Sequence, residues 1–245
     1  TGYPLYWRHR AKVAVRGTSS GPLVGLFKRA SHDVCPIPNC LVHHPNLNLA
    51  FEIVRKWIQK NGILPYNEMG GKGDLRYLQG VVQRNTGRVQ LSLVFNSSVS
   101  NKNKRDLWLS LIKQLRENDT SLWHSLWINF NDQATNVIFG SEWLLVWGEE
   151  FLWETFEGVQ VCYGPASFGQ ANLPLFEQML IRIRELIPPQ SRVAEFYAGV
   201  GVIGLFIASH CEWVRCSEIN PFAESYFQQA CALLPKNISS RISFL

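Results

Sequence analysis

The segment Arg192–Glu218 (RVAEFYAGVGVIGLFIASHCEWVRCSE) constrains the fold of this chain more than any other stretch. It reads as an apolar strand, a glycine-rich turn, a helix and a second strand that ends in an acidic residue. Strands and helices that alternate in this way build a parallel sheet covered by helices. The segment therefore predicts the beginning of an α/β unit with a glycine-rich turn that faces a ligand.

The glycines of this turn point to a nucleotide-type cofactor, and one carboxylate indicates which kind. Gly199, Gly201 and Gly204 have the G-x-G-x-x-G spacing, and Glu218 stands where a ribose-binding acid is expected, although a tight turn without any ligand can share this spacing. The strand ends in Glu195, whose carboxylate would repel a pyrophosphate. S-adenosylmethionine (SAM) carries a sulfonium, an ammonium and no phosphate. We therefore expect a SAM site and rank an NAD-dependent oxidoreductase below it.

The residues before this unit follow a different pattern. Short alternating segments, among them Asn136–Phe139, predict strands joined by turns, and two amphipathic helices are expected between them. At Tyr163 the pattern changes to an alternation of strand and helix. The sequence thus predicts an antiparallel α+β domain over residues 1–162, followed by a Rossmann-like α/β domain over residues 163–245.

Charge and cysteine content narrow the partner and the compartment. The formal net charge is +5, and the excess of basic residues lies in the N-terminal two thirds, which indicates either a polyanionic partner or a solvated basic surface. Six cysteines without framework or metal-ligand spacing predict reduced thiols in an intracellular protein, with cytoplasm, chloroplast and mitochondrion all open. We expect no metal site and no membrane segment, because the longest apolar run is short and interrupted.

Three further segments occur in a fixed order along the chain: Tyr6–Arg16 (YWRHRAKVAVR), Thr135–Gly140 (TNVIFG) and Gly164–Asn172 (GPASFGQAN). Together with the glycine turn they resemble the RNA uracil-C5 (5-methyluridine) methyltransferases, which are class I SAM-dependent enzymes. The similarity covers nearly the whole chain. It implies an enzyme that transfers a methyl group from SAM to C5 of uridine in tRNA or ribosomal RNA.

The resemblance also assigns residues to two sites. The implied cofactor-binding residues are Gln170, Glu195, Tyr197, Gly199, Gly201, Val202 and Glu218. The position of Val202 is polar in some members of the family, which weakens that assignment. Arg8, Arg10 and Lys12 match the basic strand that faces RNA, and a solvated edge strand is the alternative interpretation.

In this family a cysteine thiolate adds to C6 of uracil, C5 then attacks the methyl group, and a base removes the C5 proton. The nucleophile follows an Asp-Pro-Pro-Arg segment that this sequence lacks, and Cys211, Cys216 and Cys231 lie at the wrong end of the fold, so no catalytic residue is assigned. We therefore expect a central domain with the N-terminal half of a methyltransferase domain, inactive alone and self-associating through an unpaired strand edge. The alternative is a non-catalytic RNA-binding module with a vestigial SAM turn.

Overall fold

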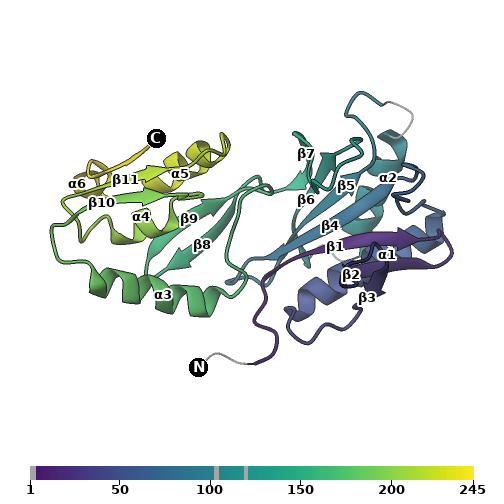
Figure 1. Ribbon diagram of the computed structural model, residues 1–245, viewed down its shortest axis with the longest axis horizontal. Helices are drawn as coiled ribbons and strands as arrows, with labels where there is room; N and C mark the ends of the chain where they lie inside the picture. Colours follow the sequence, from purple (N-terminus) through teal and green to yellow (C-terminus); the bar gives the residue numbers. More distant parts are fainter. Residues whose placement is uncertain (1–3, 102–104, 119–120) are drawn as a thin grey trace. The chain divides into compact units, whose positions relative to one another are not determined.

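The computed structural model describes residues 4–101, 105–118 and 121–245, without the side chains of residues 105, 106 and 118. The chain divides into two compact units, one that ends at Glu150 and one that begins at Phe151. Each unit has its own sheet (Figure 1). Among the described residues, no helix combines the length and the apolar composition that crossing a bilayer requires.

The first unit is built on a seven-stranded sheet in the order β3-β2-β1-β4-β5-β6-β7. Its strands are β1 (Arg10–Gly17), β2 (Pro22–Phe27), β3 (Val34–Pro36), β4 (Leu75–Val82), β5 (Val89–Phe95), β6 (Trp123–Phe130) and β7 (Glu142–Gly148). Neighbouring strands are antiparallel except β5 and β6, which are parallel because the helix α2 (Arg105–Asn118) connects them. The prediction of a mostly antiparallel α+β unit is confirmed.

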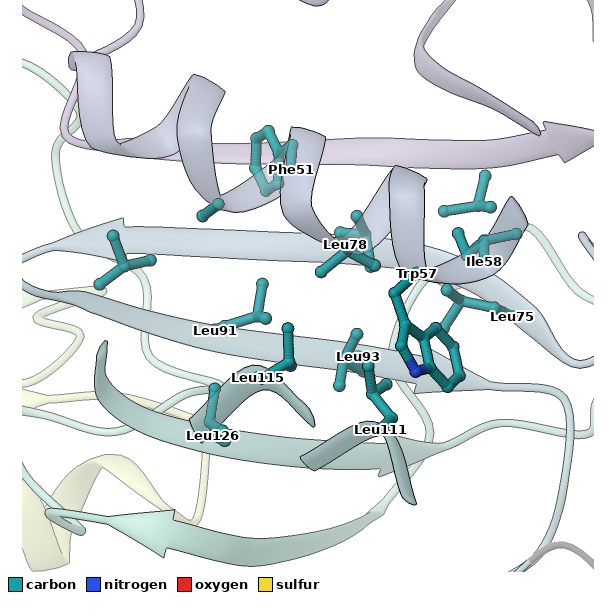
Figure 2. Close-up of a cluster of buried hydrophobic side chains, with 14 of the residues drawn as sticks. Phe51, Trp57, Ile58, Leu75, Leu78, Leu91, Leu93, Leu111, Leu115 and Leu126 are labelled. Carbon is teal, nitrogen blue, oxygen red and sulfur yellow. The ribbon is translucent and has the colours of Figure 1, made fainter. Parts of the chain in front are cut away.

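The main hydrophobic core lies between one face of this sheet and the helices α1 (Pro45–Asn61) and α2. Figure 2 shows Phe51 and Ile58 of α1 above Leu78 of β4, with Leu111 of α2 over the neighbouring strands. Successive strand residues point to opposite faces of a sheet, so β1 sends alternate side chains into this core and the remaining ones to the opposite face. The opposite face therefore carries the residues that the helices leave uncovered.

The predicted strand Asn136–Phe139 is wrong. These residues belong to the loop between β6 and β7, residues 131–141. The side-chain amide of Asn131 donates hydrogen bonds to the carbonyl oxygens of Val137 and Ile138, at 2.8 and 3.1 Å. Because these carbonyls already have a side-chain donor, they do not enter a strand ladder.

The second unit begins with the antiparallel hairpin of β8 (Leu152–Phe156) and β9 (Val159–Tyr163). The predicted domain boundary at residue 162 falls near the end of this hairpin, whereas the compact units divide before it. After α3 (Leu173–Leu186), the strands β10 (Arg192–Phe196), β11 (Trp213–Ser217) and β12 (Ile242–Phe244) form a parallel sheet in this order. The helices are α4 (Val202–Ile207), α5 (Ala223–Cys231) and α6 (Lys236–Ser239).

The alternation of strand and helix predicted for the second unit is confirmed. The helix α4 packs against β11 and β9, and α5 packs against β9, so both helices support the segments that surround the glycine turn. Among the described residues, β10 pairs with β11 alone. Association of two molecules through the other edge of β10 stays a prediction.

Candidate functional site

The glycine-rich turn between β10 and α4 is held in a left-handed backbone conformation. Tyr197, Gly199 and Gly201 have φ values of 57°, 58° and 76°. Glycine adopts such values without strain, whereas a tyrosine does so at a cost and only where its surroundings impose it. Tyr197 is also 91% exposed. A strained, exposed aromatic residue beside two glycines is a typical feature of a ligand-facing turn.

The carboxylate of Glu195 holds the start of α4, directly after the turn, by a hydrogen bond. Its Oε2 accepts hydrogen bonds from the backbone N–H of Gly204 at 2.8 Å and from the thiol of Cys216 at 3.4 Å. Burial raises the pKa of Glu195, and these two bonds only partly oppose that effect. A Cβ at Gly204 would lie 2.4 Å from Sγ of Cys216 and 2.9 Å from Oε2, so glycine is required there.

The carboxylate of Glu218 holds the turn itself by a hydrogen bond. It accepts hydrogen bonds from the backbone N–H of Asn220 at 3.0 Å and of Gly199 at 2.9 Å. These bonds, that of Asn220 first, lower the pKa of Glu218, and the carboxylate is therefore ionised at neutral pH. Each carboxylate oxygen has a second lone pair, so Glu218 retains the capacity to accept hydrogen bonds from a ligand.

A cavity of about 130 Å³ opens beside the turn. Five of the predicted cofactor residues line it together: Gln170, Glu195, Tyr197, Gly199 and Val202. No atom lies within 4 Å of the place where a side chain at Gly199 would begin, so the backbone there faces open space. Small-molecule sites usually enclose about 300–1,000 Å³, so this cavity is smaller than a complete site of that kind.

The other two predicted cofactor residues shape the turn and do not line the cavity. Glu218 acts through its bond to Gly199. A Cβ at Gly201 would lie 2.5 Å from the ring of Phe227, so α5 packs directly under this glycine. Tyr226 of the same helix likewise leaves no room for a side chain at Gly164, before the segment that carries Gln170.

Sequence reasoning missed Cys216, Tyr226 and Phe227, because their roles depend on contacts between elements. Phe168, which is 73% exposed and lines the cavity, was also missed, although it adjoins the Gln170 motif.

The predicted RNA-facing residues lie at and before the start of β1. The guanidinium of Arg8 stacks over the ring of Trp7 at 5.1 Å, while Arg10 and Lys12 are two residues apart on one face of the strand. The residue Lys12 is exposed, and its ammonium lies 4.5 Å above the ring centre of Phe139. Partial desolvation, with a contribution from Arg10, lowers the pKa of Lys12.

A larger cavity, of about 900 Å³, lies in the first unit between α1 and the β2–β3 hairpin. Its walls are mainly proline and leucine side chains, and its charged pair, Glu52 and Arg55, is already joined by two hydrogen bonds of 2.7 Å. This cavity contains no chemistry that assigns a ligand. In the part of the chain that the structure describes, no group of three or more His, Cys, Asp or Glu side chains is arranged to hold a metal ion.

No family model matches the sequence. A curated protein of Protochlamydia amoebophila, named an uncharacterized RNA methyltransferase, is 46% identical over 239 residues, which cover 97% of this chain and 62% of that protein. A protein of the same description from Listeria innocua is 32% identical over 219 residues, or 87% of this chain and 46% of that protein. One from Lactobacillus johnsonii is 30% identical over 223 residues, or 89% and 47%.

A solved structure has the same fold. It is the tRNA (uracil-54, C5)-methyltransferase of Pyrococcus abyssi in complex with S-adenosyl-L-homocysteine, with a TM-score of 0.75 and 21% identity. The match covers 98% of this chain and 55% of that one. This chain thus spans between about half and three fifths of the proteins that it matches. Over nearly its whole length, it is similar to a part of proteins that are named as RNA methyltransferases.

Proposed function

We propose that this chain is part of a SAM-dependent RNA methyltransferase that modifies C5 of uridine in tRNA or ribosomal RNA. The observation that carries the proposal is the glycine turn held between two glutamates, Glu195 and Glu218. Glu218 accepts a hydrogen bond from the N–H of Gly199 in the turn, and Glu195 accepts one from the N–H of Gly204 in the first turn of α4, so these two donors are not available to a phosphate. The relatives named as RNA methyltransferases support the reaction class.

The residues around the turn fit SAM better than a dinucleotide. Glu195 lines the cavity, and its carboxylate attracts a cationic ligand and repels a pyrophosphate. Gly199 leaves open space for close approach of a ligand to the backbone, and Glu218 retains lone pairs for ribose hydroxyls. When bound, SAM supplies an electrophilic methyl group. Gln170, from the segment before α3, closes another side of the cavity.

Three thiols of the second unit do not supply a nucleophile. Cys211, Cys216 and Cys231 are buried, and desolvation raises the pKa of each of them. Cys216 in addition faces the Glu195 carboxylate, to which it donates its proton in a hydrogen bond. A covalent mechanism through a cysteine thiolate therefore requires a nucleophile other than these three. In this proposal the second unit binds the cofactor.

The first unit contributes RNA binding in this proposal. Arg8, Arg10 and Lys12 place three cations at and before the start of β1, and cations of this kind bind RNA through phosphate oxygens. Binding of RNA is therefore expected to weaken steeply as the salt concentration rises.

Isothermal titration calorimetry of the chain with SAM tests the proposal, with Glu195→Gln as the informative variant and Glu117→Gln, in α2 of the first unit, as its matched control. We expect measurable SAM affinity, a loss in Glu195→Gln and no change in the control. RNA binding without any SAM binding would instead support the non-catalytic RNA-binding module. Absence of both would overturn the proposed function.

A further inference from the structure

Arg76 is a buried cation in the first unit that the proposed function does not use. The residue is 2% exposed, and its guanidinium stacks at 4.4 Å over the ring of Tyr66. Its Nη1 donates hydrogen bonds to the carbonyl oxygens of Asn131 and Gln133, at 2.8 and 2.7 Å, and its Nη2 donates to that of Thr135, at 3.3 Å. Among the described residues, no carboxylate forms an ion pair with it, and its Nε has no partner.

A buried cation without a carboxylate is costly unless dipoles or a ligand compensate its charge. Here the compensation comes from carbonyl groups of the loop 131–141, which turn inward toward the guanidinium. The side chain of Asn129 adds to this anchoring, because it donates to the carbonyl of Gly140 at 2.9 Å and accepts from its N–H at 2.8 Å. The loop is thus held in one shape by buried polar groups.

The inward carbonyls determine where the adjoining N–H groups point. In a planar trans peptide, the C=O of one residue and the N–H of the next point in opposite directions. Since the carbonyls of residues 131, 133 and 135 face Arg76, the N–H groups of Asp132, Ala134 and Asn136 face away from it. These three residues are exposed, and their N–H groups have no acceptor within the described part of the chain.

The loop adjoins the basic face of β1. Ile138 and Phe139 pack against a small cluster on the sheet face opposite α1 and α2, a cluster that includes Ala14 and Tyr77. The ammonium of Lys12 lies over Phe139. Outward N–H groups, a buried positive charge behind them and a neighbouring lysine together make a surface that attracts anions.

We propose that the loop 131–141 contacts phosphates of the RNA backbone through the outward N–H groups of Asp132, Ala134 and Asn136. The identity of the anion as an RNA phosphate rests on the proposed function, whereas the anion-binding character rests on the loop itself. The carboxylate of Asp132, which accepts a hydrogen bond of 2.7 Å from the side chain of Gln133, opposes binding and weakens it.

Fluorescence anisotropy of a labelled RNA hairpin, titrated with the chain over a range of salt concentrations, tests this surface. Ala134→Pro removes one outward N–H without changing the charge, and we expect it to weaken binding several-fold. Ala134→Ser keeps the N–H and is the matched control. Asp132→Asn is expected to tighten binding because it removes one negative charge that opposes the phosphate. The gain should be largest at low salt, where charges are screened least. Circular dichroism verifies that each variant is folded.

Lys12→Ala separates the two proposals. If it weakens binding and makes log K fall less steeply with log salt, by about 0.7–0.9 as one lost phosphate contact does, β1 faces the RNA. Unchanged affinity in both Ala134→Pro and Asp132→Asn would then overturn the loop proposal alone.

If the unaltered chain binds no RNA, the proposed RNA-binding role fails. The anion site can still be tested by titrating the chain with inorganic pyrophosphate and following the loop amides by nuclear magnetic resonance. No shift of the Ala134 amide in that titration would overturn it.

Discussion

Two loops of this molecule are anchored by side chains of opposite charge. In the glycine turn, Glu195 and Glu218 accept hydrogen bonds from backbone N–H groups. In the loop 131–141, Arg76 donates hydrogen bonds to backbone carbonyls. The glutamates occupy N–H groups and leave carbonyl groups for a ligand, whereas Arg76 occupies carbonyl groups and leaves N–H groups. The negative charge of the glutamates and the positive charge of Arg76 favour the same ligands as the backbone groups that they leave. The glycine turn therefore favours a cation, and the loop favours an anion.

The largest effect is expected from removing the cation of the second loop. Arg76→Met keeps the bulk of the side chain but leaves three carbonyls without their donor, and each unsatisfied buried acceptor costs about 1–3 kcal/mol. Because the loop rehydrates part of these groups, we expect a loss of about 3 kcal/mol in the free energy of unfolding. Urea denaturation measures it. Arg76→Lys, which keeps the charge but loses the fork geometry, should fall between Arg76→Met and the unaltered chain. Equal stability of Arg76→Met and the unaltered chain would show that the guanidinium does not anchor the loop.

The next effect concerns the glycine turn. In Gly204→Ala the new methyl group meets Sγ of Cys216 and Oε2 of Glu195. Overpacking of this kind costs about 1–3 kcal/mol, and it also displaces the carboxylate that faces the cavity. We expect lower stability in urea and lower SAM affinity in calorimetry.

The double variant Gly204→Ala/Cys216→Ala provides the control for this contact. It removes the sulfur that the methyl group meets, so it should recover part of the stability that the single variant loses. Purely additive effects of the two changes would mean that the glycine is not required by this contact.

The sequence predicted the glycine turn better than the loop 131–141, for a physical reason. The strand, turn and helix around Gly199 follow from local signals, namely periodicity and glycine spacing, and so do the positions of Glu195 and Glu218 at the strand ends. The anchoring of the loop depends on Arg76, which lies far away along the chain and reads locally as an ordinary strand residue. The segment Asn136–Phe139 has the composition of a strand, and only the hydrogen bonds from the side chain of Asn131 to its carbonyls show that it is not one.

A smaller effect is expected at Glu195, where one substitution should change stability and SAM affinity in opposite directions. Burial raises the pKa of Glu195, so its stabilising, protonated form is fully present below the ordinary glutamate pKa of 4.5 and is lost as the pH rises through the raised value. Glu195→Gln mimics the protonated form at every pH. We therefore expect the variant to match the unaltered chain in acid and to exceed it in unfolding free energy at neutral pH, while its SAM affinity falls. A variant that is less stable at neutral pH would contradict the assignment.

The smallest effect is expected at Glu218, and its sign is opposite. Hydrogen bonds from the N–H groups of Asn220 and Gly199 lower the pKa of Glu218, so its contribution to stability is present above pH 4.5 and is lost as the pH falls through the lowered value. Solvent screens this partly exposed carboxylate, which makes the change in Glu218→Gln smaller than that in Glu195→Gln. As the pH rises from acid to neutral, the unfolding free energies of the two variants should therefore diverge from that of the unaltered chain in opposite directions. The two substitutions would change stability alike with pH only if both glutamates had equivalent surroundings. Their surroundings differ, because Glu218 is bonded to Gly199 and Glu195 to Gly204.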